Sequence, residues 1–321
     1  GLAVNNLLRL IARRLVALPI MVVGVSFLVF FIMSLSPIDP AYSALGETAT
    51  PEALEAYRVE RGLNEPFFTQ YGTYLWNMLH GDLGLYATGT DYHVSDLVAQ
   101  ALPVTLQLTF LGLFFAVVIA FPLGVIAALY RDRWPDQLIR VISVICIGTP
   151  SFWLAALLVL AFVGGSIPVS GPIPAFGVDP SGWFLRLLLP AIALAVPVIG
   201  QMTRVVRTSM VEELDRDYVR TAIGAGIPKH VVVARNVLRN ALITPVTVLG
   251  LRIGYLMGGA VVIEIIFAID GMGKLVLLKG IQENWVTLVQ GGALVVAIAF
   301  IVVNIIVDML YLLINPRIRS V

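Results

Sequence analysis

Three stretches of the sequence, residues 15–35, 104–129 and 141–163, contain no Asp, Glu, Lys or Arg. The hydrocarbon core of a bilayer is about 30 Å thick, and a helix of about 20 apolar residues crosses it. Because lipid offers the backbone no hydrogen-bond partners, such a stretch must cross as a helix. Charged residues make up only 13% of the 321 residues, against about 25% in soluble domains. The sequence therefore predicts an all-α integral membrane protein, and its net charge of +1 argues against nucleic-acid binding.

Three further apolar segments complete a predicted set of six transmembrane helices. Each contains residues that are unusual in a spanning helix: Pro190 and Pro197 in residues 187–202, Arg252 and Glu264 in residues 242–268, and Asn304 and Asp308 in residues 288–314. The two prolines predict a short, kinked span. The first span is too long for a signal peptide, whose apolar region has about 7 to 15 residues.

The positive charges indicate how six spans would be oriented. Fifteen of the 21 Lys and Arg residues fall on the side of the two termini, and five fall on the other side. Cytoplasmic loops carry the excess of such residues, so both termini are predicted to be cytoplasmic. The predicted parts are a cytoplasmic N-terminus and first span (residues 1–35), a small extracytoplasmic lobe (36–102), a five-span core (103–314) that includes a cytoplasmic loop (204–240), and a cytoplasmic tail (315–321).

The predicted cytoplasmic loop, residues 204–240, has the pattern of a folded element. Its acidic residues come first and its basic residues last, with Gly226-Ile227-Pro228 between the two groups. Glycine can end a helix in the left-handed conformation, and proline fits the first turn of the next helix. The loop is therefore predicted to form a helix, a break and a second helix. A solvated amphipathic loop without a binding role is the alternative that the charge pattern leaves open.

Residues 220–226, Arg-Thr-Ala-Ile-Gly-Ala-Gly, have the spacing of the EAA motif, in which Glu-Ala-Ala and a glycine are separated by three residues. The motif is typical of permease subunits of binding-protein-dependent ABC importers, and Arg220 and Thr221 replace its Glu and first Ala. Other segments agree with that family in order and spacing: Ala12-Arg13-Arg14-Leu15, Gly62-Leu63-Asn64-Glu65-Pro66, Gly81-Asp82-Leu83-Gly84, Pro150-Ser151-Phe152-Trp153, Asp217-Tyr218-Val219, Leu238-Arg239-Asn240-Ala241, Gly271-Met272-Gly273 and Asn315-Pro316-Arg317. On these segments nearly the whole chain resembles the B-type permease of dipeptide and oligopeptide ABC importers. Two departures are Pro245, one residue later than the family's proline, and Asn315 in place of Asp.

The resemblance implies a function and a set of partners. The chain would form half of the translocation pathway for short peptides in the inner (plasma) membrane of a bacterial or archaeal cell; haem and nickel are other cargoes of related permeases. It would pair with a homologous second permease, receive cargo from an extracytoplasmic substrate-binding protein, and be driven by ATP and Mg on two cytoplasmic ATPase subunits. No cofactor would bind this chain itself. The residues implied to couple the loop to the ATPases are Tyr218, Arg220, Thr221, Ala222, Ala225 and Gly226.

Small and charged residues of the last two predicted spans indicate further contacts. Gly250, Gly254 and Gly258 share one helix face, which suits either a pathway or a second subunit, or packing within the chain. Arg252 and Asp308 differ in predicted depth by roughly 6 Å, which favours an intramembrane ion pair over the alternative, a contact with substrate. Glu264 lies near the external end of its span and is expected to be hydrated.

A transporter that works alone is the rival function from another class, with Arg252, Glu264 and Asp308 as an ion or proton relay. Such transporters often contain inverted repeats, and the sequence shows none. Gly273-Lys274-Leu275 lacks the preceding glycine and the following hydroxyl residue that a phosphate-binding loop requires. His80, His93 and His230 are far apart in the sequence. The chain itself is therefore not expected to be an enzyme, and we expect no catalytic, nucleotide or metal site on it.

Overall fold

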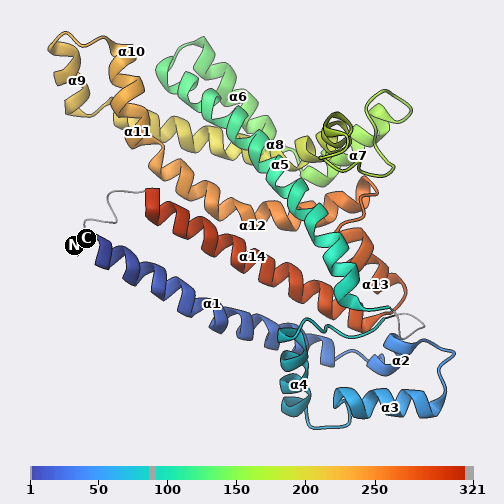
Figure 1. Ribbon diagram of the computed structural model, residues 1–321. Coiled ribbons are helices and arrows are strands. Elements are labelled where there is room, and N and C mark those ends of the chain that lie inside the picture. Colours follow the sequence, from blue (N-terminus) through green and yellow to red (C-terminus); the bar gives the residue numbers. More distant parts are fainter. Residues whose placement is uncertain (1, 87–91, 315–321) are drawn as a thin grey trace. The chain divides into compact units, whose positions relative to one another are not determined.

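The computed structural model describes residues 2–86 and 92–314, which are helical apart from turns and one isolated β-bridge between Leu85 and His93 (Figure 1). The chain divides into two compact units. The first unit comprises Gly1–Leu8, Leu108–Phe267 and Ile306–Val321, and the second comprises Arg9–Gln107 and Ala268–Ile305. Each unit is therefore assembled from segments that are far apart in the sequence.

Five helices of the described chain are long and apolar enough to cross a membrane: α1 (Leu2–Ser34), α5 (Val94–Leu129), α8 (Pro180–Leu214), α12 (Ile243–Ile266) and α14 (Val286–Ile314). A sixth span is present if α6 (Trp134–Gly148) and α7 (Ser151–Phe162) count as one. These two helices meet at 93°. The all-helical membrane fold is therefore confirmed, with five or six candidate spans.

The uninterrupted helix predicted over residues 141–163 is wrong, because the chain bends between α6 and α7. Thr149, at the bend, has an extended backbone with φ of −96° and ψ of 108°. The ring of Pro150 clashes with a helical conformation at the residue before it, and Pro150 lacks the N–H that would continue the helix. A single proline therefore ends α6 although the surrounding sequence is apolar throughout.

Helix α8 is the centre of the first unit and packs against α6, α7 and α12. The short span predicted over residues 187–202 is wrong in length, because α8 has 35 residues and continues through both Pro190 and Pro197. Both prolines are buried. Interior prolines are tolerated in membrane helices where neighbouring helices and side chains compensate for the lost backbone hydrogen bonds. The Asp179 side chain caps the helix by accepting the Gly182 N–H at 3.0 Å.

Two charged residues, Glu264 and Arg186, are buried, and for Glu264 this differs from the expectation. Glu264 in α12 is fully buried, so its expected hydration is wrong. Helix α12 packs against α7 and α8. Arg186 lies inside α8 and is 1% exposed. Its Nη2 donates to the Phe267 carbonyl at 2.6 Å, and its Nε donates to the Gly171 carbonyl at 3.0 Å.

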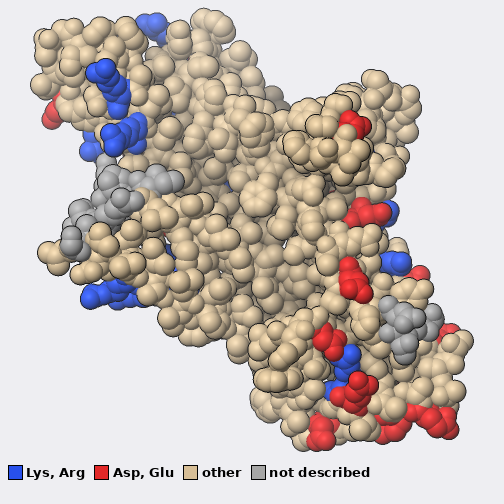
Figure 2. All heavy atoms as spheres, in the orientation of Figure 1, with Lys and Arg blue, Asp and Glu red and all other residues tan. Residues whose placement is uncertain are grey.

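Residues 36–102, predicted to form a lobe, belong to the second unit and contain α2 (Pro40–Leu45), α3 (Pro51–Arg61) and α4 (Phe67–Leu79). The second unit also contains the π-helix η2 (Met272–Leu278) and α13 (Lys279–Gln282). The Asp39 and Thr50 side chains cap α2 and α3, each with a proline in the first turn. Aromatic rings join α4 to α1, with Tyr71 5.3 Å from Phe27 between ring centroids. Figure 2 shows Asp and Glu gathered over α2–α4.

Candidate functional site

The candidate site is the set of short helices that follows α8 in the first unit. It comprises α9 (Asp217–Gly224), α10 (Lys229–Val232), the π-helix η1 (Val233–Val237) and α11 (Leu238–Ala241). The predicted helix, break and second helix are thus present. A buried cluster holds these helices on α5 and α8, and its fully or largely buried members are Ala128, Val206, Met210, Val219, Val232, Val233, Val237 and Ala241. We call residues 217–241 the coupling-loop segment below.

The break between α9 and α10 occurs at Gly226, whose φ is +94°. The Gly226 N–H donates to the Ile223 carbonyl at 3.0 Å, and the Ile227 N–H donates to the Ala222 carbonyl at 3.2 Å. This pair of bonds is the Schellman motif, which satisfies the last carbonyls of a helix and needs a left-handed residue. A side chain at residue 226 would have space, since no atom lies within 4 Å of the point that a Cβ would occupy, so the backbone angle is the reason for glycine.

The six predicted coupling residues divide between two faces of α9 and its turn. Tyr218 and Ala222 are half-buried and pack against the buried cluster of the coupling-loop segment. The other four are exposed: Arg220, Thr221, Ala225 and Gly226. The same outer surface carries Ile223 and Ile227, which are 43% and 42% exposed. The exposed face therefore combines small and aliphatic groups, while Tyr218 and Ala222 support it from within.

Exposed basic side chains outnumber the one exposed acidic side chain, Asp217, on the coupling-loop segment. Figure 2 shows Lys and Arg over α9–α11, where Arg220, Lys229, Arg235 and Arg239 are all exposed. An exposed patch of one charge sign attracts a surface of the opposite sign. The coupling-loop segment is therefore suited to bind an acidic partner surface.

Tyr218 connects α9 to the end of α8 through a buried carboxylate. Its hydroxyl donates to Glu213 Oε1 at 2.6 Å and accepts from the Asn240 amide at 3.4 Å. Glu213 also pairs with Arg216, with 3.1 Å between Oε2 and Nε. Burial, followed by the bond to Glu213, raises the pKa of the Tyr218 phenol above its usual value. The roles of Glu213 and Asn240 cannot be predicted from the sequence, since both depend on tertiary contacts.

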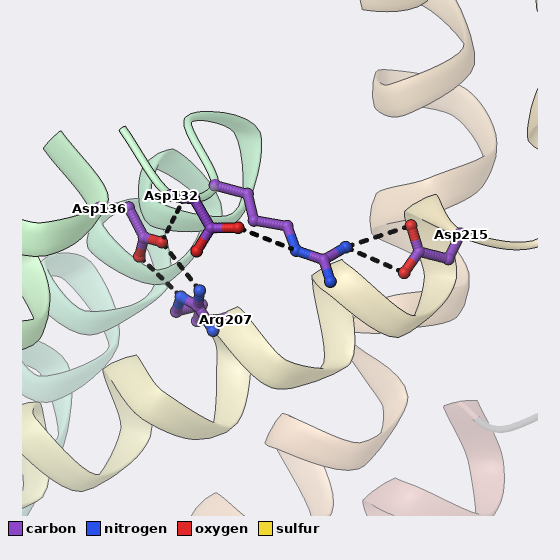
Figure 3. A network of polar contacts seen from close by, with 5 residues as sticks. Asp132, Asp136, Arg207 and Asp215 are labelled. Carbon is purple, nitrogen blue, oxygen red and sulfur yellow. Dashed lines mark hydrogen bonds and ion pairs between the residues drawn. The ribbon is translucent and has the colours of Figure 1, made fainter. Parts of the chain in front are cut away.

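A network of charged side chains links the α5–α6 turn to α8 (Figure 3). Arg207 of α8 binds Asp136 of α6 through two hydrogen bonds, of 2.7 and 2.8 Å. Asp136 also accepts the backbone N–H of Asp132 at 2.9 Å, and Asp132 has a φ of +63°. Next to this pair, Arg131 binds Asp215, which follows the end of α8, at 3.0 Å. The end of α8, just before the coupling-loop segment, is thereby connected to the α5–α6 turn and to α6.

The glycines predicted to share one face of α12 have different surroundings. A Cβ at Gly250 would lie 2.8 Å from Cγ1 of Val307 in α14, so this glycine allows close packing within the chain. Gly254 is half-buried, whereas Gly258 is exposed with no atom within 4 Å of a Cβ position. Arg252 and Asp308 are both half-buried on α12 and α14, and their pairing stays a prediction. Within residues 2–86 and 92–314, no cluster of three His, Cys, Asp or Glu side chains could hold a metal ion.

The sequence matches a known family over most of its length. Residues 120–320 match the family described as the binding-protein-dependent transport system inner membrane component, and residues 7–109 match the N-terminal part of such components. The chain belongs to this family. Its members are membrane components of transport systems, not the catalytic subunits, and the predicted resemblance is confirmed.

Curated relatives align with nearly the whole of this chain. A putative peptide transport system permease protein of Brucella abortus (strain 2308) is 40% identical over 313 residues, covering 97% of this chain and 98% of the relative. The probable D,D-dipeptide transport system permease protein DdpB of Escherichia coli (strain K12) is 36% identical, covering 96% and 97%. The glutathione transport system permease protein GsiC of the same strain is 36% identical, covering 98% and 99%.

Two solved ABC transporter structures contain a chain with a similar fold to this one. The methionine ABC transporter MetNI, in inward-facing conformations, aligns with a TM-score of 0.54 at 18% identity, covering 68% of this chain and 96% of the other. An amino acid ABC transporter aligns with a TM-score of 0.52 at 15% identity, covering 70% and 94%. The membrane fold is therefore shared with ABC transporter subunits.

Proposed function

We propose that this chain is one of two membrane-embedded permease subunits of an ABC importer for short peptides. The observation that carries the proposal is the near full-length similarity to relatives named as peptide, D,D-dipeptide and glutathione permeases. The named cargoes all contain peptide bonds. This shared chemistry favours a peptide cargo over haem or nickel.

In this proposal the coupling-loop segment docks in a cleft of a cytoplasmic ATPase subunit. The exposed face of α9 and the Gly226 turn would enter the cleft, and the basic surroundings would bind its acidic rim. Movement of α9 would pass to α5 and α8, because the buried cluster joins all three. ATP and Mg would act on the partner ATPases, and closure of those subunits would switch the side on which the permease opens.

The membrane arrangement that goes with this function has six spans and cytoplasmic termini in a bacterial inner membrane. The bent pair α6 and α7 supplies the third span, and residues 36–102 form a lobe that faces the substrate-binding protein outside. The exposed face of α12 around Gly258 would contact the second permease. The excess of Lys and Arg in the segments on the side of the termini supports this orientation.

Reconstitution of the complete transporter in liposomes tests the proposal. The full chain, its second permease, both ATPase subunits and the binding protein are expected to take up a labelled dipeptide only when ATP is present inside. An ATPase subunit unable to hydrolyse ATP serves as the matched control. Competition with unlabelled dipeptide, glutathione, haem and Ni²⁺ identifies the cargo. Uptake by this chain alone, driven by an ion gradient, would instead establish the rival transporter that needs no ATPase.

A further inference from the structure

A pocket between α6 and α8 is not used by the proposed transport function. Its volume is about 290 Å³, and it is lined by Arg140 and Val144 of α6 and by Arg204, Arg207 and Thr208 of α8. All five residues belong to the first unit. Three of the five are arginines, which is a high share for a chain whose net charge is only +1.

The packing of α6 against α8 brings Arg140 and Arg204 to the same level. The two helices approach closely at Gly200, where a Cβ would lie 2.6 Å from the Ser143 carbonyl oxygen. The Arg–Asp pair of Figure 3 joins the same helices about two turns further along, later in α8 but earlier in α6, so the helices run antiparallel here. Arg140 comes three residues before Ser143, and Arg204 comes four residues after Gly200. Their heights along the helix pair therefore differ by about 1.5 Å.

The pocket has more positive than negative charge. Asp136 accepts hydrogen bonds from Nε and Nη2 of Arg207, which balances that arginine and leaves its Nη1 outside both bonds. Arg140 is close enough to the same carboxylate to interact with its charge, so its guanidinium lies beside this pair. Arg140 and Arg204 are exposed, and neither forms an ion pair with the residues that the structure describes. Asp132, the other carboxylate whose charge acts on Arg207, is exposed and does not line the pocket.

The lining residues supply the donors that a phosphate group requires. A guanidinium holds its N–H groups in a planar fork that matches two oxygens of a phosphate. Thr208 lies one helical turn after Arg204, on the same face of α8, and adds a hydroxyl. An anion with one or two negative charges would offset the excess of guanidinium groups. A cavity of about 150 Å³ takes up benzene, so a pocket of about 290 Å³ has room for a phosphate and for the group that carries it.

An apolar stripe on α6 lies beside the pocket. Trp134, Leu138, Val141 and Ile145 recur at helical spacing, and each is more than half exposed. Val144 is also more than half exposed and lines the pocket, so it connects the pocket to the stripe. Tryptophan is typical of the interface between lipid head groups and hydrocarbon. The stripe is therefore suited to contact an acyl chain whose head group lies in the pocket.

We propose that this pocket binds the phosphate group of an anionic phospholipid. Arg140 lies about 9 Å from the start of α6, which places the pocket near the end of a candidate span. Basic pockets between membrane helices at this depth suit anionic head groups. Free phosphate offers the same oxygens, but only a lipid also covers the apolar stripe. The proposal goes beyond the transport function and does not depend on it.

A matched pair of lipids tests the need for the phosphate. Dioleoyl phosphatidic acid and dioleoylglycerol have the same acyl chains and differ in the phosphate group. Each lipid is titrated into the assembled transporter in detergent, and bound lipid is counted by native mass spectrometry. Phosphatidic acid is expected to bind saturably and at least about ten-fold more tightly, because only it forms hydrogen bonds with the charged guanidinium groups. Equal binding of the two lipids would overturn the phosphate assignment.

Inorganic phosphate tests the source of the group. It is added as a competitor to the transporter loaded with phosphatidic acid. It is expected to displace the lipid only at a concentration at least about ten-fold higher than that of the lipid, because it lacks the acyl chains that cover the stripe. Displacement at equal concentration would assign the pocket to free phosphate and overturn the lipid part of the proposal.

Two variants test the location of the site. Arg140→Gln and Arg204→Gln each remove one unbalanced charge and are each expected to weaken phosphatidic acid binding by about ten-fold. Arg207 is left intact, because its loss would leave the buried Asp136 carboxylate without its partner. Arg133→Gln is the matched control, since Arg133 is an exposed arginine just before α6 that does not line the pocket.

Melting temperatures establish that these variants are folded, and either pocket variant alone is sufficient for the test. Undiminished binding in a folded pocket variant, or an equal loss in Arg133→Gln, would overturn the proposed location. Absence of saturable binding to the wild type would overturn the proposal as a whole. Dipeptide uptake is measured separately, so failure of the transport proposal gives a different result.

Discussion

Gly226 is the residue on which the shape of the coupling-loop segment depends most directly. Its φ of +94° is unfavourable for any residue with a Cβ, although the space around it is open. Gly226→Val should therefore strain the turn by about 1–3 kcal/mol, which corresponds to a roughly 5- to 150-fold loss of the docking-competent conformation. We expect normal membrane levels and normal pairing with the second permease, but a matching loss of substrate-stimulated ATPase activity in reconstituted complexes.

Gly224→Ala is the matched control for Gly226→Val. Gly224 ends α9 with helical geometry, and no atom lies within 4 Å of a Cβ position there. Alanine is compatible with a helix, so ATPase stimulation should remain near normal. Full transport and full stimulation in the Gly226→Val variant would show that this turn is not the coupling element.

Tyr218 is expected to stabilise the same segment from within. Tyr218→Phe removes the 2.6 Å hydrogen bond to the buried Glu213 carboxylate, which still pairs with Arg216. A bond to a charged group contributes about 1.5–3 kcal/mol, and we expect a loss near the lower value with a lower thermal unfolding midpoint. Tyr42→Phe, on a tyrosine that is 46% exposed, is the control. Equal midpoints for the wild type and Tyr218→Phe would show that the bond contributes nothing to stability.

The raised pKa of Tyr218 gives this contribution a pH dependence. The folded-state pKa lies above the value of an unfolded chain, so the contribution is complete below about pH 10, the unfolded value. It should be lost as the pH rises through the folded-state pKa. The difference in unfolding midpoint between wild type and Tyr218→Phe is therefore expected to be constant from pH 6 to 9, a range that lies below about 10, and to decrease in more alkaline buffer.

At the scale of elements, the Asp136–Arg207 pair joins α6 to α8. The Asp136 side chain is fully buried and accepts both bonds of the guanidinium. Asp136→Leu leaves Arg207 without its partner and should destabilise the protein by about 3 kcal/mol. Asp136→Leu combined with Arg207→Met should recover most of that loss, because no unpaired charge remains. Thermal unfolding of the wild type, Asp136→Leu, Arg207→Met and the double variant in detergent measures the coupling energy between the two residues. Strictly additive effects of the two changes would show that the residues do not stabilise each other.

The two ends of the glycine series on α12 should respond differently to substitution. Gly250→Val places side-chain atoms against Val307, only 2.8 Å from the Cβ position, and overpacking of this kind costs about 1–3 kcal/mol. Gly258→Val meets no atom of this chain within 4 Å and should leave the isolated chain as stable as the wild type. If Gly258 contacts the second permease, the same change should weaken the pair in co-purification. Normal pairing would assign Gly258 to another environment.

At the scale of the whole molecule, orientation in the membrane can be tested on exposed positions of the lobe and loops. Cysteines at Thr69 and Val178 are expected to react with an impermeant thiol reagent added to intact cells, and a cysteine at Lys229 is not. Val178 is 85% exposed, whereas its neighbour Asp179 caps α8 and is a poorer choice for substitution. The background is a variant in which the free Cys146 is replaced by Ser. Labelling at residue 229 in intact cells would contradict cytoplasmic termini.

The sequence by itself determined the class of fold and the helix break at Gly226. Long charge-free runs must form helices in lipid, because each helix satisfies its own backbone, and this constraint is local. The positive φ of Gly226 and the helix break were also predictable. Glycine adopts the left-handed conformation that ends a helix, and a proline two residues later fits the first turn of the next helix. The Pro150 break follows the same local rule, but the apolar run around it obscured the bend.

Tertiary structure alone decided which distant side chains meet. Asp136 and Arg207 are 71 residues apart in the sequence, and Arg140 and Arg204 line one pocket from α6 and α8. The burial of Glu264 and Arg186 likewise depends on which helices pack against α12 and α8. A local sequence pattern indicates that a charged side chain needs a partner or that an apolar face needs a packing surface. It does not indicate which other segment provides the partner or the surface. The pairing of these charges therefore depends on how the helices pack.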